Sequence, residues 1–242
     1  LRKQIVLGFT ASYNKDINPQ ATLYSYNSAT GVYTSKPMNV KGGDMWKFAF
    51  NYDQGIGFYF RLMNKFALET AKSYGFLTIV DNNAADAQPE LNKQKRLGIN
   101  NEFEFSYETE KLQLTLFDRL ESNRYRYDDA SYNTTPLFNS VGISANLHLA
   151  PFEVFVQLSD DYCSGYATSA MNGHKLKSMA SVSWSFCKNK CMLRLFADDI
   201  FNKDIWYESE YSAFQRQEYS TNYIHHYLNL SFRYRLDAKA KN

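Results

Sequence analysis

The sequence predicts an all-β protein, an antiparallel up-and-down transmembrane β-barrel of about ten strands or a portion of one. Three observations predict this class. Many segments alternate strictly between apolar and polar residues, aromatic residues are frequent, and short connections alternate with long ones along the chain. Because successive side chains of a strand point to opposite sides, strict alternation indicates strands with one apolar and one polar face.

The composition argues against a helical membrane protein. Aromatic residues make up 17% of the 242 residues, and the mean hydropathy is −0.50. No stretch approaches the ~20 consecutive apolar residues that a transmembrane helix needs, whereas the alternating strands of a barrel average out to a mildly polar sequence. The net charge of +2, with scattered Lys and Arg, gives no indication of a nucleic-acid partner.

The alternating segments follow one another along the chain. They are residues 4–13, 46–52, 58–80, 103–107, 112–117, 141–149, 152–158, 182–186, 193–197 and 228–236. We expect strands of roughly 9–14 residues, close to the length that crosses a bilayer. The part between Phe66 and Phe76 would also tolerate a helical turn because of its Ala and Glu content. A separate small hairpin is predicted for residues 22–37, with its turn at residues 29–31.

The connections between these strands alternate in length. Turns of two to five residues are predicted at residues 53–55 and near Thr109, Pro151 and Asn189. Connections of ten residues or more fall at residues 14–40, 81–95, 126–136, 166–175 and 202–223. In an up-and-down sheet this pattern puts every long connection at one end. Outer-membrane barrels have short periplasmic turns and long extracellular loops, whereas a soluble sandwich has no reason for this asymmetry.

The predicted polar face is rich in charge. It carries Arg61, Lys65, Glu102, Glu104, Gln113, Asn146, His148, Glu153, Gln157, Arg194, Asn229, Arg233 and Arg235. Ten or more strands enclose more space than side chains alone fill. We therefore expect the polar face to line a lumen and the Leu, Phe, Val and Trp face to meet lipid. Trp46, Trp184 and many Tyr then form an interfacial girdle.

No residue pattern predicts a catalytic or metal site. The neighbours in Asp160-Asp161, Asp198-Asp199 and His225-His226 point to opposite faces of a strand, so none of these pairs chelates a metal readily. No Ser stands in a G-x-S-x-G context. His148 is expected to form hydrogen bonds in the lumen. We predict a protein that is not an enzyme, with no cofactor and no metal, and leave the ligand-binding residues undefined.

One enzymatic alternative is a surface protease with Asp/His pairs at the barrel rim. The candidate residues would be Asp128, Asp129, Asp160, Asp161, His174 and His225. Acidic loop residues are more often simply solvated, so this alternative is the weaker one.

The three cysteines are too few for a disulfide framework. Cys187 and Cys191 flank a tight turn, so a bridge across the base of that hairpin and a pair of free thiols both remain open, and free thiols are favoured.

Tyrosines are concentrated in the long connections. Those at or beyond the expected outer rim, together with one Trp, are Tyr125, Tyr127, Tyr132, Tyr162, Tyr166, Trp206, Tyr207, Tyr211, Tyr219 and Tyr223. Aromatic rings with polar tips suit the capture of carbohydrate or another large ligand. The competing interpretation is an interfacial aromatic belt.

Residues 150–237 resemble the C-terminal end of TonB-dependent outer-membrane receptors of Gram-negative bacteria, in particular their outer membrane protein β-barrel group. The matching motifs are Pro151-Phe152, Gly165-Tyr166, residues 183–186 (SWSF), residues 199–202 (DIFN) and the closing residues 230–236 (LSFRYRL). Upstream, Tyr24, Gly31-Val32-Tyr33 and residues 37–40 (PMNV) are also similar. The family's last strand often ends in an aromatic residue, whereas here Leu236 precedes a polar tail.

The resemblance implies a 22-stranded barrel with an N-terminal plug domain, of which residues 1–242 would be a C-terminal barrel fragment. It further implies a receptor in the cell outer membrane that imports a scarce solute, such as a glycan or a metal chelate. The expected partners are the lipid bilayer, lipopolysaccharide, the solute and, through the missing plug, the TonB complex. The alternatives are a self-contained ten-stranded adhesin or surface protease and, more weakly, a soluble β protein.

Overall fold

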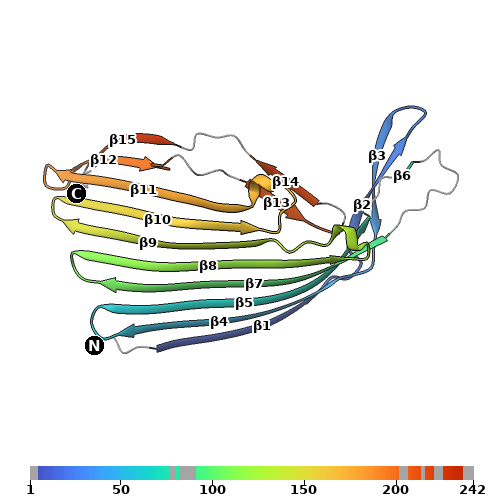
Figure 1. The fold of residues 1–242 in the computed structure, drawn as a ribbon, viewed down its shortest axis with the longest axis horizontal. Coiled ribbons are helices and arrows are strands. Elements are labelled where there is room, and N and C mark those ends of the chain that lie inside the picture. Colours follow the sequence, from blue (N-terminus) through green and yellow to red (C-terminus); the bar gives the residue numbers. More distant parts are fainter. Residues whose placement is uncertain are drawn as a thin grey trace, which may run out of the picture.

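The computed structural model describes residues 5–76, 80–81, 91–201, 207–213, 216–220 and 226–236. Its main feature is one antiparallel sheet of ten strands (Figure 1). From edge to edge these are β1 (Ile5–Lys15), β4 (Asp44–Ile56), β5 (Phe60–Phe76), β7 (Leu91–Glu108), β8 (Leu112–Tyr127), β9 (Leu137–Leu149), β10 (Phe152–Ser164), β11 (Gly173–Phe186), β12 (Cys191–Asp198) and β15 (Tyr227–Tyr234). The predicted all-β class and the up-and-down order of about ten strands are confirmed.

The sheet does not close on itself. In the described part of the chain, β1 and β15 form opposite edges and are not paired with each other. Of the two predicted possibilities, a complete barrel of about ten strands or a portion of a larger one, closure of the described strands into a barrel is not observed. Closure requires strand tilt and stagger that bring the first and last strands into hydrogen-bonding register, and here each edge strand pairs on one side only.

The two ends of the sheet differ as predicted. The connections at residues 57–59, 109–111, 150–151 and 187–190 are short, and those at the opposite end span residues 16–43, 77–90, 128–136, 165–172 and 199–226. We call these ends the short-turn end and the loop end. One predicted turn is misplaced: residues 53–55 belong to β4, and the chain turns at residues 57–59, where Gly57 adopts a φ of 65°.

Several strands are longer than predicted. β5 has 17 residues, β7 has 18 and β8 has 16, more than the ~9–11 that cross a bilayer. The segment that would tolerate a helical turn is part of β5, because its residues pair with both β4 and β7. The loop end of the sheet thus extends beyond the part that carries alternating apolar residues.

Two smaller sheets lie at the loop end (Figure 1). β2 (Gln20–Asn27) and β3 (Val32–Asn39) form the predicted small hairpin, and β6 (Val80–Asp81) pairs parallel to β2. β13 (Tyr207–Tyr211) and β14 (Arg216–Ser220) form a second hairpin. The two described helices, η1 (Ala130–Tyr132) and η2 (Ser169–Met171), are single 3₁₀ turns, and neither is long and apolar enough to cross a membrane.

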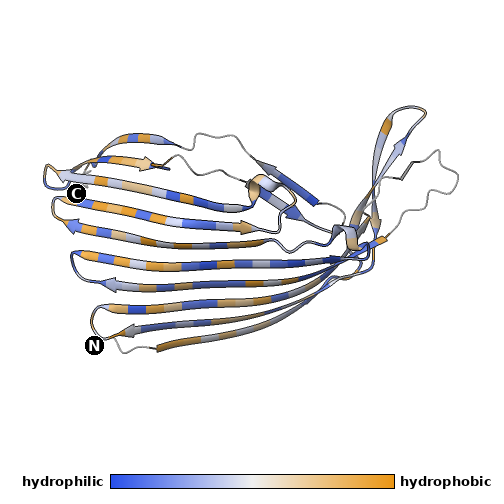
Figure 2. Ribbon diagram, in the orientation of Figure 1, coloured by the Kyte–Doolittle hydropathy of each residue, from blue (hydrophilic) through white to orange (hydrophobic). Residues whose placement is uncertain are grey.

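Strand register aligns the alternating residues into two faces. Phe152, Trp184, Leu193 and Phe232 are successive cross-strand partners in one row, and Figure 2 shows apolar and polar residues alternating along the strands. The apolar face is uncovered: Leu228, for example, is 69% exposed, and no described large side chain is fully buried. A soluble sandwich would bury such a face against a second layer.

The opposite face carries the polar residues predicted for it. Lys65 and Glu102 are direct cross-strand partners with an N–O distance of 3.2 Å. His148 and Glu153 are also partners, 3.6 Å apart. This face is the more crowded one, since small side chains such as Ser159 are buried there. The predicted separation of the two faces is confirmed.

A glycine on the polar face accommodates a large ring. Gly142 in β9 lies between Phe117 of β8 and Ser159 of β10 in the register. A Cβ at this position would come within 2.4 Å of Phe117 Cζ and 2.7 Å of the carbonyl oxygen of Leu158. The Phe117 ring therefore occupies space that only glycine leaves free.

We predict that Gly142→Val lowers the free energy of unfolding in detergent by about 2–3 kcal/mol, because the clash includes a backbone atom that cannot move independently. Gly8→Val is the matched control, since a Cβ there would meet only the Asn51 side chain, at 3.6 Å. Urea titration followed by circular dichroism measures both variants. Equal losses of stability would contradict the packing described.

Candidate functional site

The hairpin β13–β14 folds back over the polar face at the loop end. In sequence it lies between β12 and β15, at one edge of the sheet, yet its contacts are with strands near the middle. Asn92 Nδ2 of β7 donates a 2.8 Å hydrogen bond to the carbonyl oxygen of Ala213, and the ring of Tyr211 stacks on that of Tyr125 in β8 at 4.8 Å. We call residues 207–220 the docked hairpin.

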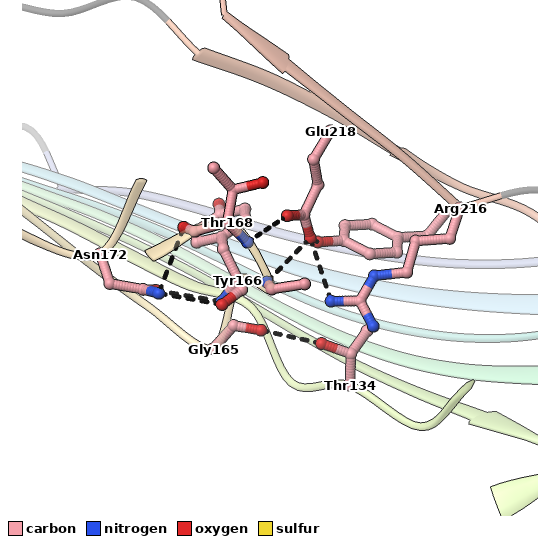
Figure 3. A network of polar contacts seen from close by, with 9 residues as sticks. Thr134, Gly165, Tyr166, Thr168, Asn172, Arg216 and Glu218 are labelled. Carbon is pink, nitrogen blue, oxygen red and sulfur yellow. Dashed lines mark hydrogen bonds and ion pairs between the residues drawn. The ribbon is translucent and has the colours of Figure 1, made fainter. Parts of the chain in front are cut away.

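One carboxylate holds this hairpin to the loop between β10 and β11. Glu218 accepts hydrogen bonds from the backbone N–H groups of Ala167 (3.1 Å) and Thr168 (2.7 Å). It also accepts bonds from Tyr211 Oη (2.7 Å) and Arg216 Nη2 (3.0 Å). Figure 3 shows these donors converging on the carboxylate. Only 5% of the Glu218 side chain is exposed, so nearly all of its bonds are to protein.

The protonation state of Glu218 follows from these contacts. Burial by itself raises the pKa of a carboxyl group, but hydrogen bonds from Tyr211, Thr168, Ala167 and Arg216 favour the charged form and lower the pKa to about 2. Glu218 is therefore ionised at neutral pH. Hydrogen bonds to a charged acceptor are roughly twice as strong as neutral ones, which makes this residue the main attachment of the docked hairpin.

The loop that receives Glu218 is itself held in place. Asn172 accepts a hydrogen bond from the Tyr166 N–H at 3.1 Å and donates one to the Tyr166 carbonyl at 2.9 Å. Thr134 Oγ1 donates to the carbonyl of Gly165 at 2.8 Å (Figure 3). Gly165 has a φ of 80°, and a Cβ there would lie 2.1 Å from the carbonyl oxygen of Thr135. The two N–H groups that bind Glu218 are thus pre-positioned.

Four tyrosines surround the attachment, and we call Tyr125, Tyr127, Tyr166 and Tyr211 the tyrosine cluster. Tyr125 and Tyr127 are only 7% and 8% exposed, and Gln94 Nε2 donates a 2.7 Å bond to Tyr127 Oη. Burial raises the pKa of Tyr166 to about 12 and also raises that of Tyr211. All four stay neutral hydroxyls at physiological pH, and those of Tyr127 and Tyr211 are bonded to Gln94 and Glu218.

The remaining rim aromatics are scattered. Tyr132 lies 6.3 Å from Tyr127, ring to ring, whereas Tyr162 lies on the apolar face beside His174. Tyr219 is 39% exposed. Tyr207 is part of β13, and Trp206 and Tyr223 lie outside the described residues.

Glu218 and Arg216 were not among the residues that the sequence predicts for a site. They occupy a polar stretch of a long connection, and nothing in the local pattern distinguishes them from solvated charges. Asn92 is similar, because this buried side chain binds the Ala213 carbonyl of the distant hairpin. The length of the connection between β12 and β15 was the only feature of the sequence that predicted a loop here.

Among the rim carboxylates and histidines that the structure describes, one Asp–His pair lies close together. Asp160 Oδ2 and His174 Nδ1 are 2.7 Å apart, but on the exposed apolar face. Asp161 faces the other way and pairs with Lys177 at 3.2 Å. Asp128 accepts a bond from the Lys93 N–H.

Asp129 and His226 have ordinary structural contacts. Asp129 caps η1, and His225 lies outside the described residues. His226 Nδ1 contacts the carbonyl oxygen of Asp199 at 2.8 Å. Within the described ranges, no group of three or more His, Cys, Asp or Glu residues could hold a metal ion. Cys163, Cys187 and Cys191 are free thiols.

No family model matches the chain, and neither the curated proteins nor the solved structures contain a match to it.

We predict that Glu218→Gln releases the docked hairpin, because a neutral amide cannot satisfy four donors. The expected loss is ~2–4 kcal/mol of docking free energy. Hydrogen exchange then becomes at least about 30-fold faster in residues 207–213 and 216–220, while β9 and β10 stay protected. Glu210→Gln, an exposed carboxylate on the same hairpin, is the control and should leave exchange unchanged.

Acidification provides a second readout of the same attachment. The pKa of Glu218 is lower in the folded protein than its ordinary value of 4.5, so its stabilisation is complete above that value and is lost as the pH falls toward 2. If hydrogen exchange in the docked hairpin changed neither in Glu218→Gln nor on acidification, the role assigned to Glu218 would be wrong.

Proposed function

We propose that the chain is the C-terminal β-barrel portion of a TonB-dependent outer-membrane receptor that imports a scarce solute. The observation that carries this proposal is a single-layer, ten-stranded meander whose apolar face is uncovered and whose long connections all lie at one end. Lipid is the environment in which an uncovered apolar face is stable. Short turns facing the periplasm and long loops facing outward are the usual arrangement of outer-membrane barrels.

The two edges of the sheet support the proposal that these strands are part of a larger barrel. An edge strand has unpaired N–H and C=O groups, which lipid cannot satisfy. β1 and β15 each pair on one side only among the described strands. In the proposed receptor, further strands pair with β1 and continue around to β15, giving the 22-stranded barrel of the family that the chain resembles.

In this arrangement the polar face lines the lumen. Charges of both signs lie on it, including Arg61, Lys65, Glu102 and Glu104, which suits a water-filled or plug-filled interior. The docked hairpin narrows the outer mouth, where Tyr132 and Tyr219 are exposed. Neutral aromatic hydroxyls favour an uncharged polyhydroxylated ligand such as a glycan over a strongly charged one.

Energy for transport comes from elsewhere in this proposal. The inner-membrane TonB complex acts on the plug domain, and displacement of the plug opens the lumen. The chain described here contributes wall, lumen lining and outer loops. The alternative of a self-contained ten-stranded adhesin requires β1 and β15 to meet, and the register of the described strands does not support that closure.

Thiol labelling in intact cells tests the proposed location and orientation. In a Cys187→Ser background, a cysteine at Ala130 of the loop end should react with a membrane-impermeant maleimide. A cysteine at Lys111 of the short-turn end should react only after the outer membrane is permeabilised. Both positions are exposed, so intrinsic accessibility is matched. Equal labelling in intact cells, or recovery of the protein in the soluble fraction, would exclude the proposed orientation.

Transport is tested separately by growth on a panel of glycans and metal chelates as limiting nutrients. Strains that lack either this receptor or TonB should fail on at least one shared nutrient. Correct labelling without any shared growth defect would support the barrel but reject the import function.

A further inference from the structure

The turn between β11 and β12 has a cysteine at each end. β11 ends at Phe186 and β12 begins at Cys191, and these two residues are the last cross-strand partners of the hairpin. Cys187 follows Phe186 directly and is the first residue of the turn. The Lys190 N–H donates a 3.2 Å hydrogen bond to the Cys187 carbonyl oxygen. The register therefore brings both cysteines to the base of the same tight turn.

The two thiols are in contact but differ in exposure. The Cys187 and Cys191 side chains interact through a hydrogen bond, Cys187 is exposed and Cys191 is buried. A disulfide joins residues whose Cα atoms are about 4.4–6.8 Å apart, and a tight turn holds its ends less than about 7 Å apart. A bond between the two sulfur atoms therefore requires little movement of the backbone.

The backbone of this turn is strained. Three successive residues that are not glycine have left-handed conformations: φ is 51° at Cys187, 56° at Lys188 and 64° at Asn189. Asn tolerates this region better than other residues with a side chain, whereas Cys and Lys disfavour it. A covalent bond between the two ends of the turn would restrict the alternative conformations and so favour the one observed.

The third cysteine is too far away to compete. Cys163 lies 11 residues beyond Phe152 in β10, and Phe152 is the cross-strand partner of Trp184 near the turn. At ~3.3 Å per residue this separation is roughly 36 Å. Cys163 is also buried. Among the three cysteines, Cys187 and Cys191 are therefore the pair that can join within one chain.

The turn also contacts the last strand of the sheet. Tyr234 of β15 is the cross-strand partner of Cys191, and the Arg235 N–H donates a 2.8 Å hydrogen bond to the carbonyl oxygen of Lys190. A bond that fixes the turn would therefore also fix the groups to which the end of β15 is paired.

We propose that Cys187 and Cys191 form a reversible intramolecular disulfide. The exposed Cys187 thiolate attacks a disulfide of the oxidant, either glutathione disulfide or the disulfide of a thiol oxidase, and displaces one thiolate. The Cys191 thiolate then attacks the Cys187 sulfur and displaces the second. The two cysteines lose two electrons and two protons, and the oxidant disulfide becomes two thiols.

This inference rests on the proposed function for the compartment in which the reaction takes place. The turn lies at the short-turn end of the sheet, which faces the periplasm in the proposed receptor, and disulfides form and persist in that oxidising compartment.

Peptide mapping of the full chain tests the proposal. The chain in detergent is incubated with glutathione disulfide, denatured, alkylated, digested with trypsin and analysed by mass spectrometry. Trypsin cleaves after Lys188 and Lys190, within the turn, so the disulfide keeps residues 178–188 and 191–194 joined until a reductant is added. At least about nine-tenths of the chains should give this joined species, and Cys163 should be alkylated.

Two single variants form the matched control, since each leaves two cysteines. Cys163→Ser should keep the joined species and Cys187→Ser should lose it. The disulfide of the folded chain should also resist reduction by glutathione at least about tenfold better than that of a synthetic peptide of residues 178–194. Alkylation of both Cys187 and Cys191 after oxidation, a glutathione adduct left on Cys187, a bond between two chains or equal resistance in the peptide would overturn the proposal.

Acid-quenched alkylation in intact cells separates this inference from the proposed function. A disulfide that forms in the purified chain but is absent in cells would leave the chemistry of the turn in place and count against a periplasmic short-turn end. A purified chain that forms no disulfide, with the thiol labelling expected for the proposed orientation, would reject the inference and leave the proposed function standing.

Discussion

The uncovered apolar face is the constraint on which the rest of the structure depends. Ten strands pair in a register that aligns Phe152 with Trp184, Leu193 and Phe232 and so collects apolar side chains on one side. Among the described residues no second layer covers them, and no large side chain is fully buried. A single sheet of this kind gains its stability from the environment on its apolar side, because the hydrophobic effect acts only when apolar surface leaves water.

The same constraint explains why tertiary structure is concentrated on the polar face. There the docked hairpin attaches through Glu218 to backbone donors of the β10–β11 loop and through Tyr211 to Tyr125. These contacts are polar and aromatic rather than aliphatic, which suits a surface that faces water on its far side. Paired ions such as Lys65–Glu102 also lie on this face.

Local patterns predicted the strands well, because period-two alternation and short turns are properties of neighbouring residues. The small hairpin of β2 and β3, the polar face and the two ends of the sheet all follow from them. The turn after β4 was misplaced because Asp53 and Gly55 are common turn residues, yet here Asp53 remains in β4 and binds Arg61 of β5. The lengths of the long strands were underestimated. Polar residues such as Lys72 and Lys95 continue the strand pairing beyond the segments in which apolar residues alternate.

What depends on contacts between distant residues could not be predicted. The attachment through Glu218 joins residues about 50 positions apart, and the contact of Asn92 with Ala213 spans 121 positions. Of the tyrosines expected at the rim, the structure brings four together and leaves Tyr162 on the other face. Whether the sheet closes depends on strand pairing at its two edges, which alternation within each strand does not determine.

In the proposed receptor, the apolar face meets lipid while the polar face meets water. Spin labels placed singly at residues 153–158 of β10, with the protein in a bilayer, measure this directly through collision with oxygen and with a water-soluble nickel chelate. Labels at Val154, Val156 and Leu158 should be relaxed by oxygen, and those at Glu153, Phe155 and Gln157 by nickel. A uniform response along the strand, or the opposite alternation, would contradict the account.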